Sequence, residues 1–392
     1  MLNNRQIVRT AEHVSEGHPD KFCDQVADRI LDQVYILAGK DQEVRKKMRT
    51  AIECLAKDNL LAISGEIRLT PEVSEKLDVT ALAKEVWARI GYGDSSNLTV
   101  INHIQTQSAE ISGEASEPEN NDALSGADQG GAGDQGIMVG YATNETTDFL
   151  PQCYVYARDI CRKLQDLRLA DKRIKSDAKT QITLNEKGEV TSVIVAVQHS
   201  RFRKGYLTKP DLENLVVEKA LKEILPNIPK RVIINGTGLF TIGGPVGDAG
   251  VVGRKIVVDA YGPQVPVGGG AYSGKDPTKV DRSAAYMARY IAKQIVAQEI
   301  NGSTECLVKL AYGIGQIQPE MIFAVTDKGD VSKYIREKFQ DLSPGFIIDF
   351  LGLRNPTGDP TKRLSEKEGW NYVDTAAYGH YGRSSFPWEQ LQ

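Results

Sequence analysis

The sequence predicts an α+β fold in which three related layers of strands pack with helices. The chain has 392 residues, whereas single hydrophobic cores stop growing near about 250–300 residues, so two or three domains are expected. Strand and helix patterns alternate in roughly three rounds along the chain. Hairpin signals in these rounds imply antiparallel pairing, which favours α+β over a purely parallel sheet.

The first third contains the most regular helix pattern. Apolar residues recur at helical spacing over residues 19–38, and Pro19 suits the first turn, where its missing N–H costs nothing. A second helix is expected from a cap at Asp78 to a stop at Gly91. The strands expected here cover residues 60–63 and 67–69, on either side of Gly65, and residues 98–104.

The same alternation continues to the C-terminus. The turn Asn185–Gly188 predicts a hairpin between strands at 182–184 and 190–198. The remaining expected elements are a helix over 211–224 that ends before Pro226, strands over 232–234 and 255–260, a helix over 281–299, strands over 306–312 and 320–326, and a helix near 331–340.

Composition argues against several classes of protein. A formal net charge of −4 disfavours nucleic acid as the main partner, because duplex binders need a basic face. No stretch approaches the ~20 apolar residues of a membrane-spanning helix, and the N-terminus lacks the apolar core of a signal peptide. The five cysteines are scattered without Cys-x-x-Cys spacing, which is typical of reduced thiols in a cytoplasmic protein.

The segment Ser108–Gly136 is rich in acidic residues and glycine and contains no Lys or Arg. Loops longer than ~12–15 residues are usually functional lids or linkers, and composition leaves both readings open. The end of this segment, Gly130–Gly136, is more specific. Its glycines let backbone amides approach a ligand closely, and Asp134 is able to reach a hydroxyl group.

Gly17–Lys21 places an imidazole, a carboxylate and an ammonium at the start of the first helix. Free N–H groups and the helix dipole favour anions there. Asp20 can hold Mg²⁺, a cation that prefers oxygen ligands, or it can simply cap the helix. His18 is the one histidine in a convincing site. The others are expected to be structural: His13, His103, His199 and His380.

A glycine- and lysine-rich run, Gly268–Arg282, is the strongest functional signal. It contains a Gly-x4-Gly-Lys pattern that ends at Lys275, like a P-loop, but Asp276 stands where that motif needs Ser or Thr. No apolar strand precedes it, so we reject the P-loop. The glycines still permit close approach of a ligand. Lys275 and Lys279 supply charge for phosphates, and Asp281 can be a second metal ligand.

A further glycine turn, Gly243–Asp248, follows an expected strand that includes Phe240 and precedes Arg254 and Lys255. The sequence has no Gly-x-Ser-x-Gly, Cys–His or His-Glu-x-x-His motif. It therefore suits an ATP- and magnesium-dependent reaction in which one substrate attacks the other. The enzyme would stabilise a departing polyphosphate by positioning and electrostatics.

Together these segments resemble the S-adenosylmethionine synthetase (methionine adenosyltransferase) family. The motifs that carry the resemblance are Ser15–Lys21, Gly131–Gly136, Tyr141–Glu145, Asp177–Lys179, Gly243–Asp248, Gly253–Lys255, Gly270–Arg282, Thr375–Arg383 and Phe386–Trp388. They run in family order from about Val8 to Glu389. The resemblance implies three intertwined, structurally similar domains and transfer of the adenosyl group of ATP to methionine, followed by hydrolysis of the triphosphate. It also implies a cytoplasmic dimer or dimer of dimers, with sites between subunits.

The resemblance also implies roles for individual residues. Catalytic roles fall on His18, Lys179, Arg254, Lys255 and Lys275. Nucleotide contacts are implied for these five and for Asp134, Asp177, Phe240, Asp248 and Ala271. Methionine contacts are implied for Glu66, Gln107, Asp248 and Lys279. Asp20 and Asp281 are the implied ligands of two Mg²⁺ ions, and Glu53 that of one K⁺ ion.

Three features depart from the family pattern. Leu239 stands where an arginine commonly precedes the stacking phenylalanine, and Lys175-Ser176 replaces a common Arg-Pro. The stretch 108–128 is longer and more acidic than the usual gate over the site, so we expect a gate with altered closure or substrate tolerance. The expected domains are 1–115, a gate and ligand loop at 116–136, 137–246 and 247–392, discontinuous in space.

Two alternative functions remain open at this point. A homologue that binds ATP but catalyses weakly would lack a metal carboxylate or a phosphate lysine, yet these residues are present. An adenosyltransferase for a methionine analogue would keep the nucleotide site and change the gate. A general phosphotransferase is disfavoured, because no base that would activate an acceptor is visible.

Overall fold

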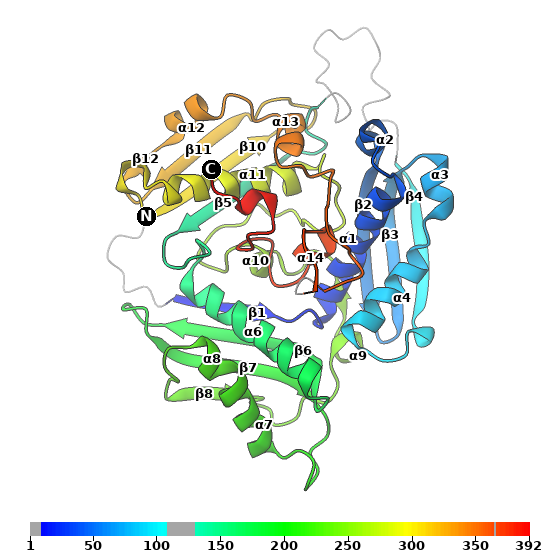
Figure 1. Ribbon diagram of the computed structural model, residues 1–392, viewed down its shortest axis with the longest axis vertical. Helices are drawn as coiled ribbons and strands as arrows, with labels where there is room; N and C mark the ends of the chain where they lie inside the picture. The colour runs from blue at the N-terminus through cyan, green and yellow to red at the C-terminus, as the bar shows by residue number, and fades with distance from the viewer. Residues whose placement is uncertain (1–8, 108–129, 364–365) are drawn as a thin grey trace.

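The computed structural model describes residues 9–107, 130–363 and 366–392. Within these ranges the chain forms three four-stranded sheets, each packed with helices (Figure 1). The predicted α+β fold of three intertwined layers is confirmed. The gate expected over residues 108–128 lies outside the described residues.

The first sheet has the strand order β4–β3–β2–β9, and α1 and α4 pack on it (Figure 1). Its elements are β2 (Arg49–Lys57), β3 (Leu60–Arg68), β4 (Thr99–Thr106), β9 (Gly250–Val251), α1 (Pro19–Leu37) and α4 (Val79–Ile90), with the short helices α2 (Gln42–Lys47) and α3 (Pro71–Lys76) beside them. Both predicted helices are confirmed, and the Asp78 carboxylate caps α4 by accepting the Ala81 N–H at 2.9 Å. The two strands expected around Gly65 form one continuous strand, because Gly65 stays in the strand with φ 124°, a value open to glycine.

The second sheet has the order β1–β6–β7–β8. Its elements are β1 (Arg9–Val14), β6 (Ile174–Leu184), β7 (Val190–His199) and β8 (Arg231–Ile234), with α6 (Gln152–Ala170), α7 (Lys209–Val216) and α8 (Lys222–Ile224). The predicted hairpin between β6 and β7 is confirmed. The predicted helix over 211–224 is also present, although one π turn at Val217–Leu221 interrupts it.

The third sheet has the order β12–β11–β10–β5, and the long helix α11 lies against β5 and β10. Its elements are β5 (Gly136–Thr143), β10 (Glu305–Tyr312), β11 (Met321–Thr326), β12 (Gly329–Asp330), α11 (Val280–Ala297), α12 (Ser332–Lys338) and α13 (Pro344–Phe350). All residues of α11 except Asp281 and Ala297 are buried, so this helix forms part of the core. Gly140 of β5 allows the close packing, because a Cβ there would lie 2.0 Å from the Ala288 carbonyl carbon.

Each sheet combines strands that are distant in the sequence. β1 pairs with β6, β5 pairs with β10, and β9 pairs with β2. These crossings hold the three layers together and bring loops from all parts of the chain toward α1. The domain boundaries drawn from the sequence stay a prediction.

Two expected strands are corrected. Residues 255–260 do not form a strand, because Ile256–Asp259 make one helical turn, α10, in which the Asp259 N–H donates to the Lys255 carbonyl at 2.8 Å. Phe240 lies in a loop after β8, where its carbonyl accepts the N–H of His199 at the end of β7 and its own N–H donates to the His199 ring.

The five cysteines are free and buried, as their spacing predicted. In the described part of the chain, no helix combines the length and apolar character that a bilayer crossing requires.

Candidate active site

Helix α1 carries four aspartates on one face. Its first turn begins at Pro19, and the His18 Nδ1 caps the turn by accepting the Asp20 N–H at 3.1 Å. The four are Asp20, Asp24, Asp28 and Asp32, each at most 3% exposed. Residues four apart lie on the same side of a helix, so these carboxylates form one buried row. We call them the aspartate row.

Each carboxylate of the aspartate row accepts backbone N–H groups from another segment. Asp20 accepts from Val251 at 2.9 Å, and Asp24 accepts from Gly253 at 2.8 Å. These two bonds hold the turn that leads into Arg254 and Lys255. The backbone N–H groups of this turn thereby supply hydrogen bonds that the buried carboxylates require.

The other half of the aspartate row holds two further segments. Asp28 accepts from Gly274 at 3.0 Å, which fixes the run that contains Lys275. Asp32 accepts from Tyr372 and Val373, each at 2.9 Å, at the start of α14 (Tyr372–Thr375). One helix therefore positions three loops that are distant from it in the sequence.

The first cluster of charged side chains comprises His18, Asp20 and Lys255. The Lys255 Nζ lies 2.5 Å from one Asp20 oxygen, and the His18 ring lies 3.9 Å from the same oxygen. Burial and the Lys255 charge lower the pKa of His18 to about 4, so the imidazole is neutral near pH 7. Burial opposes ionisation of Asp20, but the hydrogen bonds from Lys255 and Val251 outweigh it and lower the pKa of Asp20.

The second cluster lies in the run 268–282. Lys275 pairs with Asp281 at 2.5 Å, and Lys279 pairs with Asp276 at 2.5 Å. A Cβ on Gly270 would lie 2.2 Å from the Asp281 carboxylate, so only glycine leaves that carboxylate room. Burial disfavours the charge on Asp276, yet Lys279 and the nearby Arg49 hold its pKa below the usual range.

Asp276 explains why the run is not a P-loop. Its carboxylate accepts the Thr50 N–H of β2 at 2.9 Å and the Thr278 hydroxyl at 2.7 Å. Asp276 therefore anchors the run to the first sheet. Lys279, whose ammonium pairs with it, is 7% exposed as a residue, so most of it is enclosed by protein.

The third group surrounds the turn at α9 (Gly244–Gly247). Asp177 of β6 accepts the Gly244 N–H at 2.7 Å. Burial raises the pKa of Asp177 to about 7, against the effect of this hydrogen bond and with a further contribution from the charge of Asp248. Lys179, two residues along β6, pairs with Glu12 of β1 at 2.8 Å.

Comparison with known proteins gives a family for this arrangement. Three family models match the chain, described as the N-terminal, central and C-terminal domains of S-adenosylmethionine synthetase, over residues 6–109, 129–240 and 242–390. The chain belongs to the S-adenosylmethionine synthetase family.

Relatives named S-adenosylmethionine synthase support this assignment. The protein of Petrotoga mobilis is 39% identical over 423 residues, covering 99% of this chain and 97% of the relative. That of Hyphomonas neptunium is 40% identical over 412 residues, covering 97% and 95%. The resemblance that the sequence motifs suggested is thus confirmed.

The other residues to which the family resemblance points lie on the edges of these clusters. Glu53 is on β2, where burial raises its pKa and the Lys275 charge opposes the shift. Glu66 lies on β3, opposite Ala51 of β2. Gln107 follows β4, and its Oε1 is buried without a hydrogen bond to any described group.

The remaining predicted residues are more open or contribute backbone. Asp134 accepts the Gln135 N–H at 2.8 Å. Asp248 and Arg254 are exposed. Ala271 lies against Gly253, where a Cβ would be 2.6 Å from that of Ala271, so the run 268–282 packs against the turn that precedes Lys255. Phe240 is half-buried beside the loop.

The predicted site residues do not all lie together in the structure. Asp20 and Lys255 form one cluster, and Asp281 and Lys275 form another. The sequence motifs do not show this separation, because they carry no information on how the segments pack. Among residues 9–107, 130–363 and 366–392, no hydrogen bond or ion pair links the side chains of the two clusters.

Sequence reasoning missed the interior of the site. Lys21 pairs with Asp24 at 2.8 Å and with Asp259 at 2.5 Å, and all three are buried. The i, i+4 spacing of the aspartates in residues 20–32 was the available signal. Acidic residues at that spacing would normally face solvent, and the sequence alone does not show which loops cover them.

The donor set fits magnesium held jointly by protein and phosphate. In the described residues, no group of three or more His, Cys, Asp or Glu side chains is arranged to hold a metal. Mg²⁺ usually keeps several waters and binds through one or two carboxylates plus substrate phosphates. Asp20 and Asp281 each offer one carboxylate beside a lysine, which suits that mode.

Proposed function

We propose that this chain transfers the adenosyl group of ATP to the sulfur of L-methionine and then hydrolyses the released triphosphate to pyrophosphate and phosphate. The observation that carries the proposal is the pair of clusters, Asp20 with Lys255 and Asp281 with Lys275, each anchored to the aspartate row. Such charges suit a polyphosphate leaving group. Family membership and the absence of a visible base agree with it.

The first step needs no general base. The methionine sulfur attacks C5′ of ATP, a C–S bond forms, and the C5′–O bond breaks with its electron pair going to the triphosphate. The sulfur becomes a sulfonium, and no proton leaves. In the second step, water adds to a phosphorus of the triphosphate, and a P–O bond breaks to give pyrophosphate and phosphate.

The catalytic residues would act by positioning charge and hydrogen bonds. His18 is neutral near pH 7, so it would hydrogen-bond to the departing oxygen and not pair with it as a cation. Lys179, Arg254, Lys255 and Lys275 would contact the polyphosphate. Two Mg²⁺ ions, held by Asp20 and Asp281, would neutralise phosphate charge. One K⁺ ion would lie by Glu53.

The substrates would occupy separate sides of the site. Asp134, Asp177, Phe240, Asp248 and Ala271 would contact the nucleotide. Glu66, Gln107, Asp248 and Lys279 would contact methionine. The ammonium of Lys279 is already paired with Asp276, so we expect its contribution to methionine binding to come with movement of that pair or through its aliphatic stem.

We further propose that two copies of the chain complete each site. The support is the family resemblance, which implies sites between subunits, and the two clusters share no side-chain bond within the described chain, which is compatible with it. A dimer would place one cluster of each copy opposite the other cluster of its partner. Analytical ultracentrifugation with activity measured across protein concentration tests this, and an active monomer would contradict it.

The activity is tested by incubating the protein with ATP, methionine, Mg²⁺ and K⁺ and separating the products by mass spectrometry. S-adenosylmethionine, pyrophosphate and phosphate should appear together, whereas ADP would contradict the proposal. Asp20→Asn and Lys275→Ala should lower the rate at least about 100-fold. Lys333→Ala on α12, whose side chain is 89% exposed, is the matched control and should keep full rate.

A homologue that only binds ATP would give no S-adenosylmethionine in this assay. An enzyme for a methionine analogue would turn over that analogue with a higher kcat/KM than methionine. Neither alternative is favoured, since the residues of both clusters are complete and the family match spans nearly the whole chain.

A further inference from the structure

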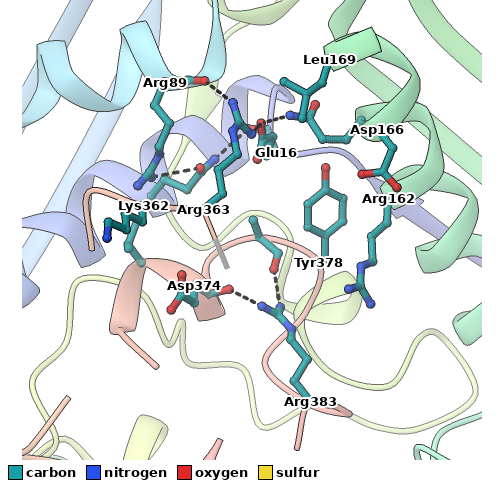
Figure 2. A pocket seen from close by; sticks show the side chains of 14 residues that line it. Glu16, Arg89, Arg162, Asp166, Leu169, Lys362, Arg363, Asp374, Tyr378 and Arg383 are labelled. Carbon is teal, nitrogen blue, oxygen red and sulfur yellow. Dashed lines mark hydrogen bonds and ion pairs between the residues drawn. The ribbon is translucent and has the colours of Figure 1, made fainter. Parts of the chain in front are cut away.

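A cavity of about 130 Å³ lies where the loop before α1 meets α4, α6 and the C-terminal segment (Figure 2). It is separate from both charged clusters of the candidate active site. Cationic side chains dominate its wall: Arg89, Arg162, Lys362, Arg363 and Arg383. They come from elements that are far apart in the sequence and meet only at this point.

The carboxylates in the wall neutralise part of its positive charge, and one of their partners, Arg363, is itself a wall residue. Glu16 accepts from Arg363 at 2.9 Å and from Arg168 at 3.1 Å. Asp374 pairs with Lys367 at 2.9 Å. Asp166 is exposed. Arg162 and Lys362 also lie by carboxylates outside the wall, Asp159 at 3.7 Å and Asp359 at 4.0 Å, so the uncompensated charge is that of Arg89 and Arg383.

Two guanidinium groups in the wall have no carboxylate partner. Arg383 donates to the backbone carbonyls of Asp374, Ala377 and Gly379, at 2.8, 2.5 and 2.5 Å, and forms no ion pair within the described residues. Arg89 donates to the Pro360 carbonyl at 2.9 Å and likewise forms no ion pair there. Burial and the charge of Arg162 lower the pKa of Arg383 to about 9. A cation in such surroundings is stabilised by an anion.

Tyr378 adds an uncharged donor to the same wall. Its backbone adopts the left-handed conformation, φ 61°, which is uncommon for a residue with a side chain. Its buried hydroxyl completes no hydrogen bond with a described group, although the Glu16 backbone is close. Figure 2 shows this ring extending between Glu16 and the side chains of α6.

We propose that this cavity binds a small phosphate-class dianion. Arg89 and Arg383 supply positive charge that no carboxylate among the described residues pairs with, which favours an oxyanion, and Tyr378 supplies a hydroxyl donor. Drug-sized ligands occupy pockets of roughly 300–1,000 Å³, so a cavity of about 130 Å³ suits a phosphate group better than a whole nucleotide. The source is inorganic phosphate or the phosphoryl group of a small monoester.

The test is calorimetric titration of the full chain with inorganic phosphate, in the absence of ATP and methionine. Arg89→Gln should raise the Kd at least about tenfold, because it removes a charged donor. Lys362→Gln should also weaken binding, and its 58% exposed side chain can be changed without disturbing the interior. Arg231→Gln, an exposed residue on β8, is the control and should leave the Kd unchanged.

Lys275→Ala separates this cavity from the candidate active site. Phosphate binding that survives Lys275→Ala and is lost in Arg89→Gln supports the proposal. The proposal is overturned if Arg89→Gln and Lys362→Gln both bind phosphate with the same Kd as the wild type, or if phosphate binding is lost only in Lys275→Ala. A parallel titration with phenyl phosphate identifies the source of the phosphate group. If only the monoester binds, and Arg89→Gln weakens that binding, the site is assigned to phosphomonoesters. If neither inorganic phosphate nor phenyl phosphate binds, the proposal is overturned.

Discussion

The buried pair between Asp28 and Arg282 gives the sharpest prediction about stability. Both side chains are 0% exposed, and the Asp28 oxygens accept from the two terminal nitrogens of Arg282 at 2.7 and 2.9 Å. Asp28→Asn keeps the shape of the side chain and removes its charge. The guanidinium then remains buried with uncharged partners alone: the Tyr372 ring at 4.3 Å and the oxygens of Lys275, Tyr286 and Thr375 at 3.0–3.1 Å.

The expected cost follows from the energetics of buried ion pairs. Removing one partner of such a pair costs about 3–5 kcal/mol. An unfolding entropy of about 2.1 cal/mol/K per residue gives roughly 0.8 kcal/mol/K for 392 residues. If the chain unfolds as one unit, the Tm should therefore fall by about 4–6 °C.

Differential scanning calorimetry measures this shift. The matched control is Asp349→Asn, which breaks a pair with Arg354 in which the aspartate is 70% exposed. A surface pair contributes about 0–1 kcal/mol, so the control should move the Tm by about 1 °C or less. A Tm for Asp28→Asn within 1 °C of the control would refute the reasoning, because it would mean that Arg282 finds other compensation.

Two further changes test other parts of the structure. Gly140→Ala should lower the free energy of unfolding by about 1–3 kcal/mol, because the new Cβ would clash with the Ala288 backbone of α11. The control in the same denaturation experiment is Gly236→Ala, whose Cβ would meet only an Ile233 methyl at 3.2 Å. Asp177→Asn should change the pH dependence of the Tm. The pKa of Asp177 is raised from 3.8 to about 7, so the folded state keeps a proton that the unfolded chain releases, and stability falls as pH rises between about 4 and 7. The variant lacks this loss, so its Tm relative to wild type should rise across that window, and parallel curves would contradict the assignment.

The sequence predicted the helices that have clean apolar periodicity or clear caps. Helix α1 was expected over 19–38 and covers Pro19–Leu37. Helix α6 was missed, because buried polar residues such as Arg158 and Gln165 interrupt its apolar pattern. The strand expected at 255–260 was wrong, although Ile256–Val258 favour a strand locally. Tertiary context overrides such preferences, and here Asp259 is held by Lys21.

The candidate site was predictable in its parts but not in its assembly. Motifs indicated the lysines and the carboxylates at positions 20 and 281, and the structure shows each beside a lysine. The backbone groups that the aspartate row holds lie 229 to 341 residues away in the sequence. No local pattern encodes such distances, because they depend on how the three sheets pack.

The pairing of β5 with β10 has a consequence for synthesis of the chain. About 170 residues separate Thr143 at the end of β5 from Tyr312 at the end of β10. At a translation rate of roughly 5–20 residues per second, β5 waits roughly 8–34 s for its neighbour. During that time its apolar residues, Met138 and Val139 among them, have no sheet to join. The nascent chain therefore presents an unpaired strand to the cell, and its yield depends on how well that strand is shielded until β10 arrives.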